Sequence, residues 1–121
     1  MRSRVGSIKR SQKESLYYRI LSTLLMQAAQ DDSRLAGAFI TRVELSPDKS
    51  LCYVFFGDTD EEAFKVKLEV LKLYKGSLRK ALADEIKSRY VPDIKFKFDK
   101  TLEKQLEVEQ LMDKLKDDGE L

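Results

Sequence analysis

Apolar residues recur along this chain with two different periods, and each change of period marks a new element. The first pattern is helical and repeats about every 3.6 residues. Its apolar positions are Tyr17, Ile20, Leu21, Leu24, Leu25 and Ala28. Ser11 and Ser15 are suitable N-terminal caps, so the pattern predicts an amphipathic helix from there to about Ala29.

Two stretches with a period of two come next. Phe39, Thr41, Val43 and Leu45 alternate with more polar neighbours, and Leu51 to Phe56 is rich in aromatic and β-branched residues. The intervening SPDK suits a type I turn, because Pro47 pre-sets φ and Asp48 tolerates the next position. The pattern predicts a β-hairpin.

Helical spacing returns from about Asp60, after acidic residues that favour a helix N-terminus. The apolar positions up to Leu73 and those from Leu78 to Ile86 follow different phases, with Gly76 between them. Glycine inside a helix costs roughly 1 kcal/mol relative to alanine, so we predict that two helices meet at an angle at Gly76. The second should end near Arg89, because Pro92 disfavours helix before it.

The remaining chain predicts one strand and one helix. DIKFKFD places Ile94, Phe96 and Phe98 on one face and Lys95 and Lys97 on the other. Thr101 can cap a last helix with a modest apolar stripe, which fades into KDDGEL. The stripe consists of Val108, Leu111, Met112 and Leu115. Helices packed on one face of a small sheet give a two-layer α+β domain.

Composition fits one domain and a reducing compartment. The chain has 121 residues, 42% of them hydrophobic, with one cysteine and no histidine. The basic start followed by apolar residues imitates a secretory signal, but Glu14 and Arg19 interrupt it, and we expect a cytoplasmic protein. The acid-free start leaves an organelle transit peptide open. No segment has the roughly 20 apolar residues that span a bilayer, so no membrane association is expected.

Charge is unevenly distributed. Residues 1–13 carry five basic residues and no acid, residues 65–97 carry ten against four acids, and residues 99–121 carry eight acids against four lysines. This segregation suggests a surface that faces a polyanion and a separate acidic end. A solvated lysine-rich surface explains the charge alone equally well.

Residues that support catalysis are scarce. Without histidine the commonest general base and metal ligand is missing, and one cysteine cannot build a zinc cluster. Cys52 lies within a predicted strand and is expected to be a buried core residue. The acidic pairs at Asp31 and Asp60 lie at helix boundaries, where capping explains them. We expect no enzyme, cofactor or metal site.

Nucleic-acid binding fits the basic residues better. If the basic side chains of the start and of the second half share a face, they could neutralise several phosphates. The tyrosines could stack on bases, but a core or rim role is the better prediction for each. The candidate contacts are Arg4, Lys9, Arg10, Lys13, Lys75, Arg79, Lys80, Lys87 and Arg89.

Several short motifs, in order, resemble the bacterial ribosome-binding factor A family. DSRLAGAFITRVELSPDKS is similar to that family's Asp-x-Arg-Leu, Ile-Thr-x-Val and Ser-x-Asp. GSLRKALADEIKSRYVPDIKFKFDKTLE is similar to its later signature of Gly-x-(Ile/Leu)-Arg, Pro-(Glu/Asp)-Leu and Asp-x-(Ser/Thr)-Leu-Glu. The likeness covers about Lys9 to Leu115, and Arg79 and Arg89 match signature positions.

The resemblance implies a KH-like domain of the second type, with the order α-β-β-α-kinked α-β and a C-terminal helix. We expect residues 1–10 to form a flexible basic arm, 11–99 the KH-like domain and 100–121 the C-terminal helix with a frayed acidic tail. The implied function is non-catalytic assembly of the small ribosomal subunit. Family members bind ribosomal RNA on immature small subunits and help to mature its 5′ region. We expect a monomer when free.

The family also replaces the KH Gly-x-x-Gly loop with a kinked Ala-x-Gly joint. The matching residues are Tyr74, Lys75 and Gly76, so the glycine is present and the alanine is not. We therefore expect a more open kink, with Tyr74 pointing outward, and binding through phosphate charge and RNA shape. An alternative function is an adaptor whose acidic C-terminal helix docks on a ribosomal protein.

Overall fold

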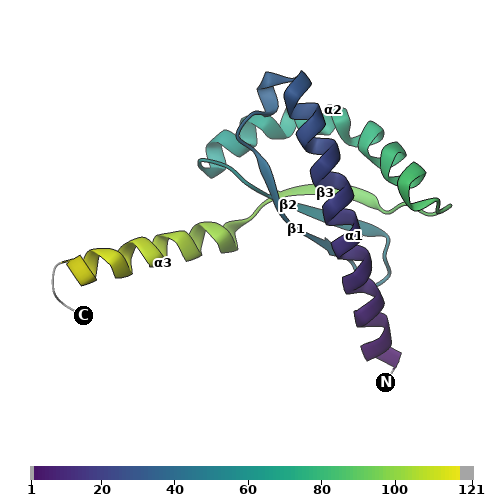
Figure 1. Cartoon of the computed structure of the whole chain (residues 1–121), viewed down its shortest axis with the longest axis horizontal. Coiled ribbons are helices and arrows are strands. Elements are labelled where there is room, and N and C mark those ends of the chain that lie inside the picture. The colour runs from purple at the N-terminus through teal and green to yellow at the C-terminus, as the bar shows by residue number, and fades with distance from the viewer. Residues whose placement is uncertain (1, 118–121) are drawn as a thin grey trace.

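A computed structural model describes the backbone of residues 2–117, and the side chains in that range except those of 2–8, 102, 103 and 117. Within these residues the helices and strands follow the predicted order, except that the two helices predicted on either side of Gly76 form one. The order is α1 (Arg2–Asp31), the short 3₁₀ helix η1 (Ser33–Leu35), β1 (Phe39–Leu45), β2 (Leu51–Gly57), α2 (Glu61–Ile86), β3 (Asp93–Phe98) and α3 (Lys100–Asp117). The predicted α+β class is confirmed (Figure 1).

The sheet has the order β1-β2-β3, with β1 antiparallel and β3 parallel to β2. The predicted hairpin is confirmed: the Lys49 amide donates to the Ser46 carbonyl at 2.8 Å across the turn. A parallel pair needs a long crossover, and α2 supplies it between β2 and β3. The sheet register is therefore set on one side by a tight turn and on the other by a helix.

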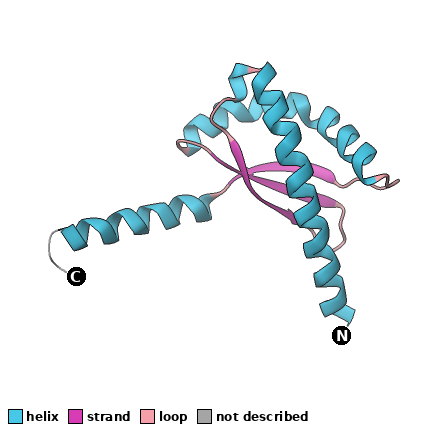
Figure 2. Ribbon diagram, viewed as in Figure 1, coloured by secondary structure: helices cyan, strands magenta, loops and turns pink. Residues whose placement is uncertain are grey.

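Helices α1 and α2 lie on the same face of the sheet (Figure 2). The core between the two layers contains Leu21 and Leu25 of α1, Leu71 and Leu82 of α2, and the inward side chains of the strands. Those strand residues include Ile40, Val43, Cys52, Val54, Phe56 and Ile94. The residues between them along each strand face away from both helices, because side chains alternate across a sheet.

Helix α1 begins earlier than predicted. We predicted a start at Ser11, but the helix starts at Arg2, and Ser11 and Ser15 lie inside it. Extending an existing helix costs little per residue, and no proline interrupts residues 2–10. The segment predicted as an arm thus has a helical backbone from Arg2 to Arg10.

The predicted division of the second helical region was wrong. Helix α2 continues through Gly76 as one element, and ends at Ile86 instead of near Arg89. Lys87 has a left-handed backbone (φ 52°) and its amide donates to the Ala83 carbonyl, which closes the helix. The axis nevertheless bends: in Figure 1 the first half rises toward α1 and the second half descends beyond it.

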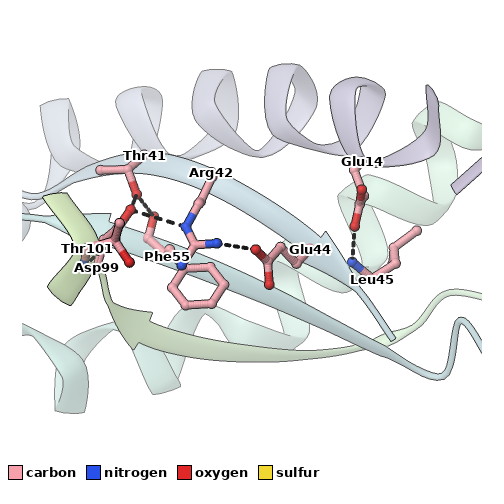
Figure 3. Close-up of polar contacts among 8 residues, drawn as sticks. All are labelled: Glu14, Thr41, Arg42, Glu44, Leu45, Phe55, Asp99 and Thr101. Carbon is pink, nitrogen blue, oxygen red and sulfur yellow. Dashed lines mark hydrogen bonds and ion pairs between the residues drawn. The ribbon is translucent and has the colours of Figure 1, made fainter. Parts of the chain in front are cut away.

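Asp99 anchors α3 to the sheet (Figure 3). Its buried carboxylate accepts a hydrogen bond from the Thr41 hydroxyl at 2.6 Å and another from Arg42 Nε at 3.3 Å. The same carboxylate accepts the Thr101 amide at 3.1 Å, in the manner of an N-terminal cap. The predicted cap, Thr101, was wrong: α3 starts at Lys100.

Beyond that anchor, α3 extends away from the two-layer body (Figure 1). The predicted apolar stripe is exposed: Val108, Leu111 and Met112 are 59%, 57% and 51% accessible. The stripe therefore does not join the core. The predicted frayed tail falls largely on residues 118–121, which lie outside the described residues.

Candidate nucleic-acid interface

Three separate segments line a solvent-open hollow of about 730 Å³ at one side of the domain. Helix α1 contributes Lys13 and Tyr17, the β1–β2 turn contributes Lys49, and the end of α2 with the following loop contributes Arg79 and Tyr90. Leu16, Ile86 and Val91 add apolar surface. The hollow therefore combines an apolar lining with three cations from distant parts of the sequence and with the carboxylates of Asp48 and Asp93. Because cations outnumber carboxylates in this lining, we call it the basic hollow.

Arg79 has a structural role within the basic hollow. Its Nε donates to the Pro92 carbonyl at 3.3 Å, and its terminal nitrogen donates to the Val91 carbonyl at 3.1 Å. These bonds hold the loop that leads into β3. The guanidinium has five N–H donors, so it retains further donors for a ligand.

Lys75 lies at the edge of the same region, where Asp93 lines the basic hollow. The Lys75 ammonium is 3.2 Å from the Asp93 carboxylate. A hydrogen bond and charge attraction from Lys75, with a smaller contribution from Arg79, lower the pKa of Asp93. Lys75 is thus already paired with a carboxylate inside the protein.

The loop after α2 presents exposed side chains beside the basic hollow. Lys87 and Arg89 are exposed, and Tyr90 is 88% accessible. The Ser88 hydroxyl donates to the Tyr90 carbonyl at 3.2 Å and lies 3.3 Å from the Tyr90 amide, which donates back to it. A locally bonded loop that presents a bare tyrosine ring next to cations suits stacking on an unpaired base.

Helix α1 extends the positive surface from the basic hollow toward its own start. Lys13 follows Lys9 by four residues and Arg10 by three, so it is a neighbour of both on the surface of the helix. Lys9 and Lys13 are exposed and Arg10 is half-buried. Arg4 belongs to the same helix, but its side chain lies outside the described residues.

The predicted contacts are thus only partly brought together. Lys13 and Arg79 meet in the basic hollow, Lys75, Lys87 and Arg89 adjoin it, and exposed Lys80 does not line it. Sequence reasoning missed Lys49, because a lysine in a turn is normally a solvated residue. Its position next to the Pro47–Asp48 turn was the only available signal.

The predicted kink residues have a different geometry from the one expected. Tyr74 was predicted to point outward, but it is half-buried and its hydroxyl donates to the Asp32 carboxylate at 2.8 Å. Hydrogen bonds from Arg34 and Tyr74 hold the pKa of Asp32 well below its usual range. Tyr74 therefore ties α2 to the connection between α1 and β1. At Gly76 an added Cβ would meet no atom within 4 Å, so no close approach requires glycine there.

The groups considered for catalysis have structural roles. Cys52 is completely buried as predicted, and burial, with a contribution from Glu14, raises the pKa of its thiol to about 12. Asp60 caps α2 by accepting the Ala63 amide at 2.7 Å. Among the described residues, no group of three or more cysteine, aspartate or glutamate side chains is placed to hold a metal ion. In the same part of the chain, no helix has the length and apolarity to cross a membrane.

Comparison with known proteins supports the resemblance seen in the sequence. Residues 9–112 match the family model for ribosome-binding factor A. The chain is 37% identical over 97 residues to ribosome-binding factor A of Prochlorococcus marinus subsp. pastoris, covering 78% of this chain and 74% of that protein. It is 32% identical over 117 residues to the same factor of Citrifermentans bemidjiense, covering 93% and 98%.

Solved structures give the same result for the fold. The crystal structure of ribosome-binding factor A from Thermus thermophilus superimposes with a TM-score of 0.61 at 28% identity, covering 72% of this chain and 92% of that one. A Thermus thermophilus homology model fitted into a cryo-EM map of its complex with the 30S subunit gives a TM-score of 0.56 at 28% identity, covering 68% and 86%. The predicted KH-like fold is confirmed, and this chain belongs to the ribosome-binding factor A family.

Proposed function

We propose that this chain is a non-catalytic assembly factor that binds ribosomal RNA on immature small ribosomal subunits and assists maturation of the 5′ region of that RNA. Family membership supports the ribosomal target. One observation carries the RNA contact: cations from α1, the β1–β2 turn and the end of α2 converge on the basic hollow. The factor would act in the cytoplasm and as a monomer when free.

The test uses cations that the structure leaves exposed. Lys13, Lys49 and Arg89 are exposed, whereas Arg79 bonds to the loop carbonyls and Lys75 pairs with Asp93. We therefore propose the triple variant Lys13→Ala, Lys49→Ala, Arg89→Ala. Each neutralised phosphate contributes roughly 0.7 to 0.9 to the salt slope, so the slope of subunit binding should fall by about 2 to 3.

A control variant removes two positive charges from a remote surface. Lys65 and Lys72 lie in the first half of α2 and pair with Glu62 and Glu69 three residues before them. Lys65→Ala, Lys72→Ala should leave both subunit binding and its salt slope unchanged. In cells that depend on this factor, only the triple variant should accumulate small-subunit RNA with an unprocessed 5′ end. Equal behaviour of the two variants would contradict the proposal.

A second function is favoured by the exposed stripe of α3. Leu111 and Met112 are more than half exposed on a helix with several acidic residues, which suits docking on a basic ribosomal protein. Leu111→Gln, Met112→Gln should then abolish subunit association while RNA titrations show no binding. If the basic-hollow variants lose association instead, the adaptor function is refuted.

A further inference from the structure

The face of the sheet that α1 and α2 leave uncovered has an ordered arrangement of rings and cations. Strand register places Arg42 of β1 beside Phe55 of β2, and Phe55 beside Lys97 of β3. The next row places Glu44 beside Tyr53, and Tyr53 beside Lys95. Phe55 on the central strand is thus flanked by cations from both edge strands, whereas Tyr53 has a lysine on the β3 side and Glu44 on the β1 side.

The rings point away from the core. Cys52, Val54 and Phe56 are buried against the helices, so Tyr53 and Phe55 between them face the other way. Both rings are half-buried, and Lys95 and Lys97 are exposed. The rings therefore contribute little to the hydrophobic core, although aromatic residues are costly to leave at a water-facing surface.

The cations already contact these rings. Arg42 Cζ is 3.9 Å from the centre of the Phe55 ring, and Lys97 Nζ is 4.6 Å from the centre of the Tyr53 ring. Figure 3 shows the Arg42 guanidinium beside Phe55 and bonded to both Asp99 and Glu44. Arg42 is held in a fixed position by these two carboxylates, so its flat guanidinium offers a preformed plane.

This combination matches the chemistry of single-stranded nucleic acid. Bases stack on aromatic rings and on arginine planes, and lysines beside them neutralise the phosphates that link the bases. Tyr53 and Phe55 are two residues apart on one strand and so lie about 7 Å apart, a separation that splayed neighbouring bases can span. Glu44 lies on the same face, but its carboxylate forms an ion pair with Arg42. This pairing reduces the repulsion between Glu44 and the RNA phosphates.

We infer that this open face binds unpaired nucleotides of RNA, with bases stacked on Tyr53 and Phe55 and phosphates held by Lys95 and Lys97. The inference rests on the proposed function for the source of the RNA. It adds a second contact surface, formed by sheet residues that do not line the basic hollow. A protein surface, a second copy of the chain or helix α3 itself are the other occupants that the test separates.

The test is a fluorescence anisotropy titration of a labelled ten-nucleotide single-stranded RNA and of an RNA duplex of equal length. Tyr53→Leu and Phe55→Leu remove the rings but retain apolar volume and every charge. Each should weaken single-strand binding by at least about fivefold, leave duplex binding and the salt slope unchanged, and keep the thermal midpoint. Lys97→Gln should instead lower the single-strand salt slope by about 0.7. Leu73→Ala changes an exposed apolar residue of α2 and is the control, which should change nothing.

A second readout begins with the wild-type protein. The chain has five tyrosines and no tryptophan, so tyrosine emission reports directly on stacking. Single-stranded RNA should quench the emission of the wild-type protein, and quench it less in Tyr53→Leu. Unchanged wild-type emission at saturating RNA would overturn the inference.

The remaining outcomes are equally decisive. Equal single-strand affinity in wild type and both leucine variants overturns the inference, as does an equal loss for single strand and duplex. If the leucine variants lose subunit association but bind the oligonucleotide normally, or form dimers differently from wild type, the face meets protein and the inference fails. The oligonucleotide titration needs no subunit, so its failure leaves the proposed function standing. That function fails only if the basic-hollow variants retain subunit binding.

Discussion

Replacing Asp99 with alanine should remove the contacts that hold α3 to the sheet and should also destabilise the edge strand β1. The carboxylate is 4% exposed and joins three segments: Thr41 and Arg42 in β1, the end of β3, and the first turn of α3. Thr41 and Arg42 lie at an irregularity in the β1–β2 pairing. Such a bulge leaves an unpaired residue, and the Asp99 carboxylate compensates for it.

The size of the effect follows from the lost contacts. Loss of an N-terminal cap costs about 1 kcal/mol. Hydrogen bonds to a charged group contribute about 1.5 to 3 kcal/mol, but the Arg42 side chain is 40% exposed and keeps Glu44 as a partner, so its share is small. The Thr41 hydroxyl keeps only the Phe55 carbonyl, at 3.2 Å. We therefore expect Asp99→Ala to lower the free energy of unfolding by about 3 kcal/mol.

Urea unfolding followed by circular dichroism measures this loss. With a slope of about 1.5 kcal/mol per molar urea, the midpoint should fall by about 2 M. Asp99→Asn keeps a capping oxygen and should lose only about 1 to 1.5 kcal/mol. Glu62→Ala removes an exposed carboxylate and should change stability by less than about 0.5 kcal/mol. A loss in Asp99→Ala no larger than that of Glu62→Ala would refute the anchoring role.

Three further predictions concern single residues. Gly76→Ala should raise the free energy of unfolding by about 0.5 to 1 kcal/mol, because Gly76 is an exposed, uncrowded position inside α2. A lower urea midpoint in this variant would show that α2 needs glycine at this position. Cys52 should not react with a disulfide reagent at pH 8 while the protein is folded, because its thiol is buried. It should react fully once guanidinium unfolds the protein, and rapid labelling of the native protein would contradict its burial. The Ser46 hydroxyl and the Ser50 amide and hydroxyl lower the pKa of Asp48 to about 2, so the turn's stabilisation is complete above about pH 4 and is lost as the pH falls toward 2. The Ser50 amide resonance should follow this titration, and Ser46→Ala should move its midpoint upward.

Local patterns predicted the strands well because a strand's periodicity lies within its own few residues. Ile94, Phe96 and Phe98 face the core and Lys95 and Lys97 do not, as their alternation indicated. The hairpin was predictable for the same reason, since Pro47 and Asp48 favour one turn. Helix boundaries were less accurate: α1 starts well before Ser11, and Gly76 does not divide α2.

Long-range polar contacts could not be predicted from one sequence. Asp99 meets Thr41, which lies 58 positions away, and the Glu14 carboxylate accepts the Leu45 amide at 2.6 Å across 31 positions (Figure 3). Neither contact can be recognised from the spacing or composition of the residues around it in the sequence. The same limit explains the missed contribution of Lys49, because only the packing of the turn against α1 and α2 brings it to the basic hollow.

Two basic residues in the second half of α2, Lys75 and Arg79, fix where β3 begins. Arg79 holds the carbonyls of Val91 and Pro92, and Lys75 pairs with Asp93, the first residue of β3. A shift of β3 by one residue would turn Lys95 and Lys97 into the core, since side chains alternate along a strand. Arg79→Ala should therefore lower both the urea midpoint and RNA binding, whereas Lys49→Ala should lower RNA binding alone. If Arg79→Ala weakened binding at unchanged stability, Arg79 would act as a direct phosphate contact instead of a residue that positions the strand.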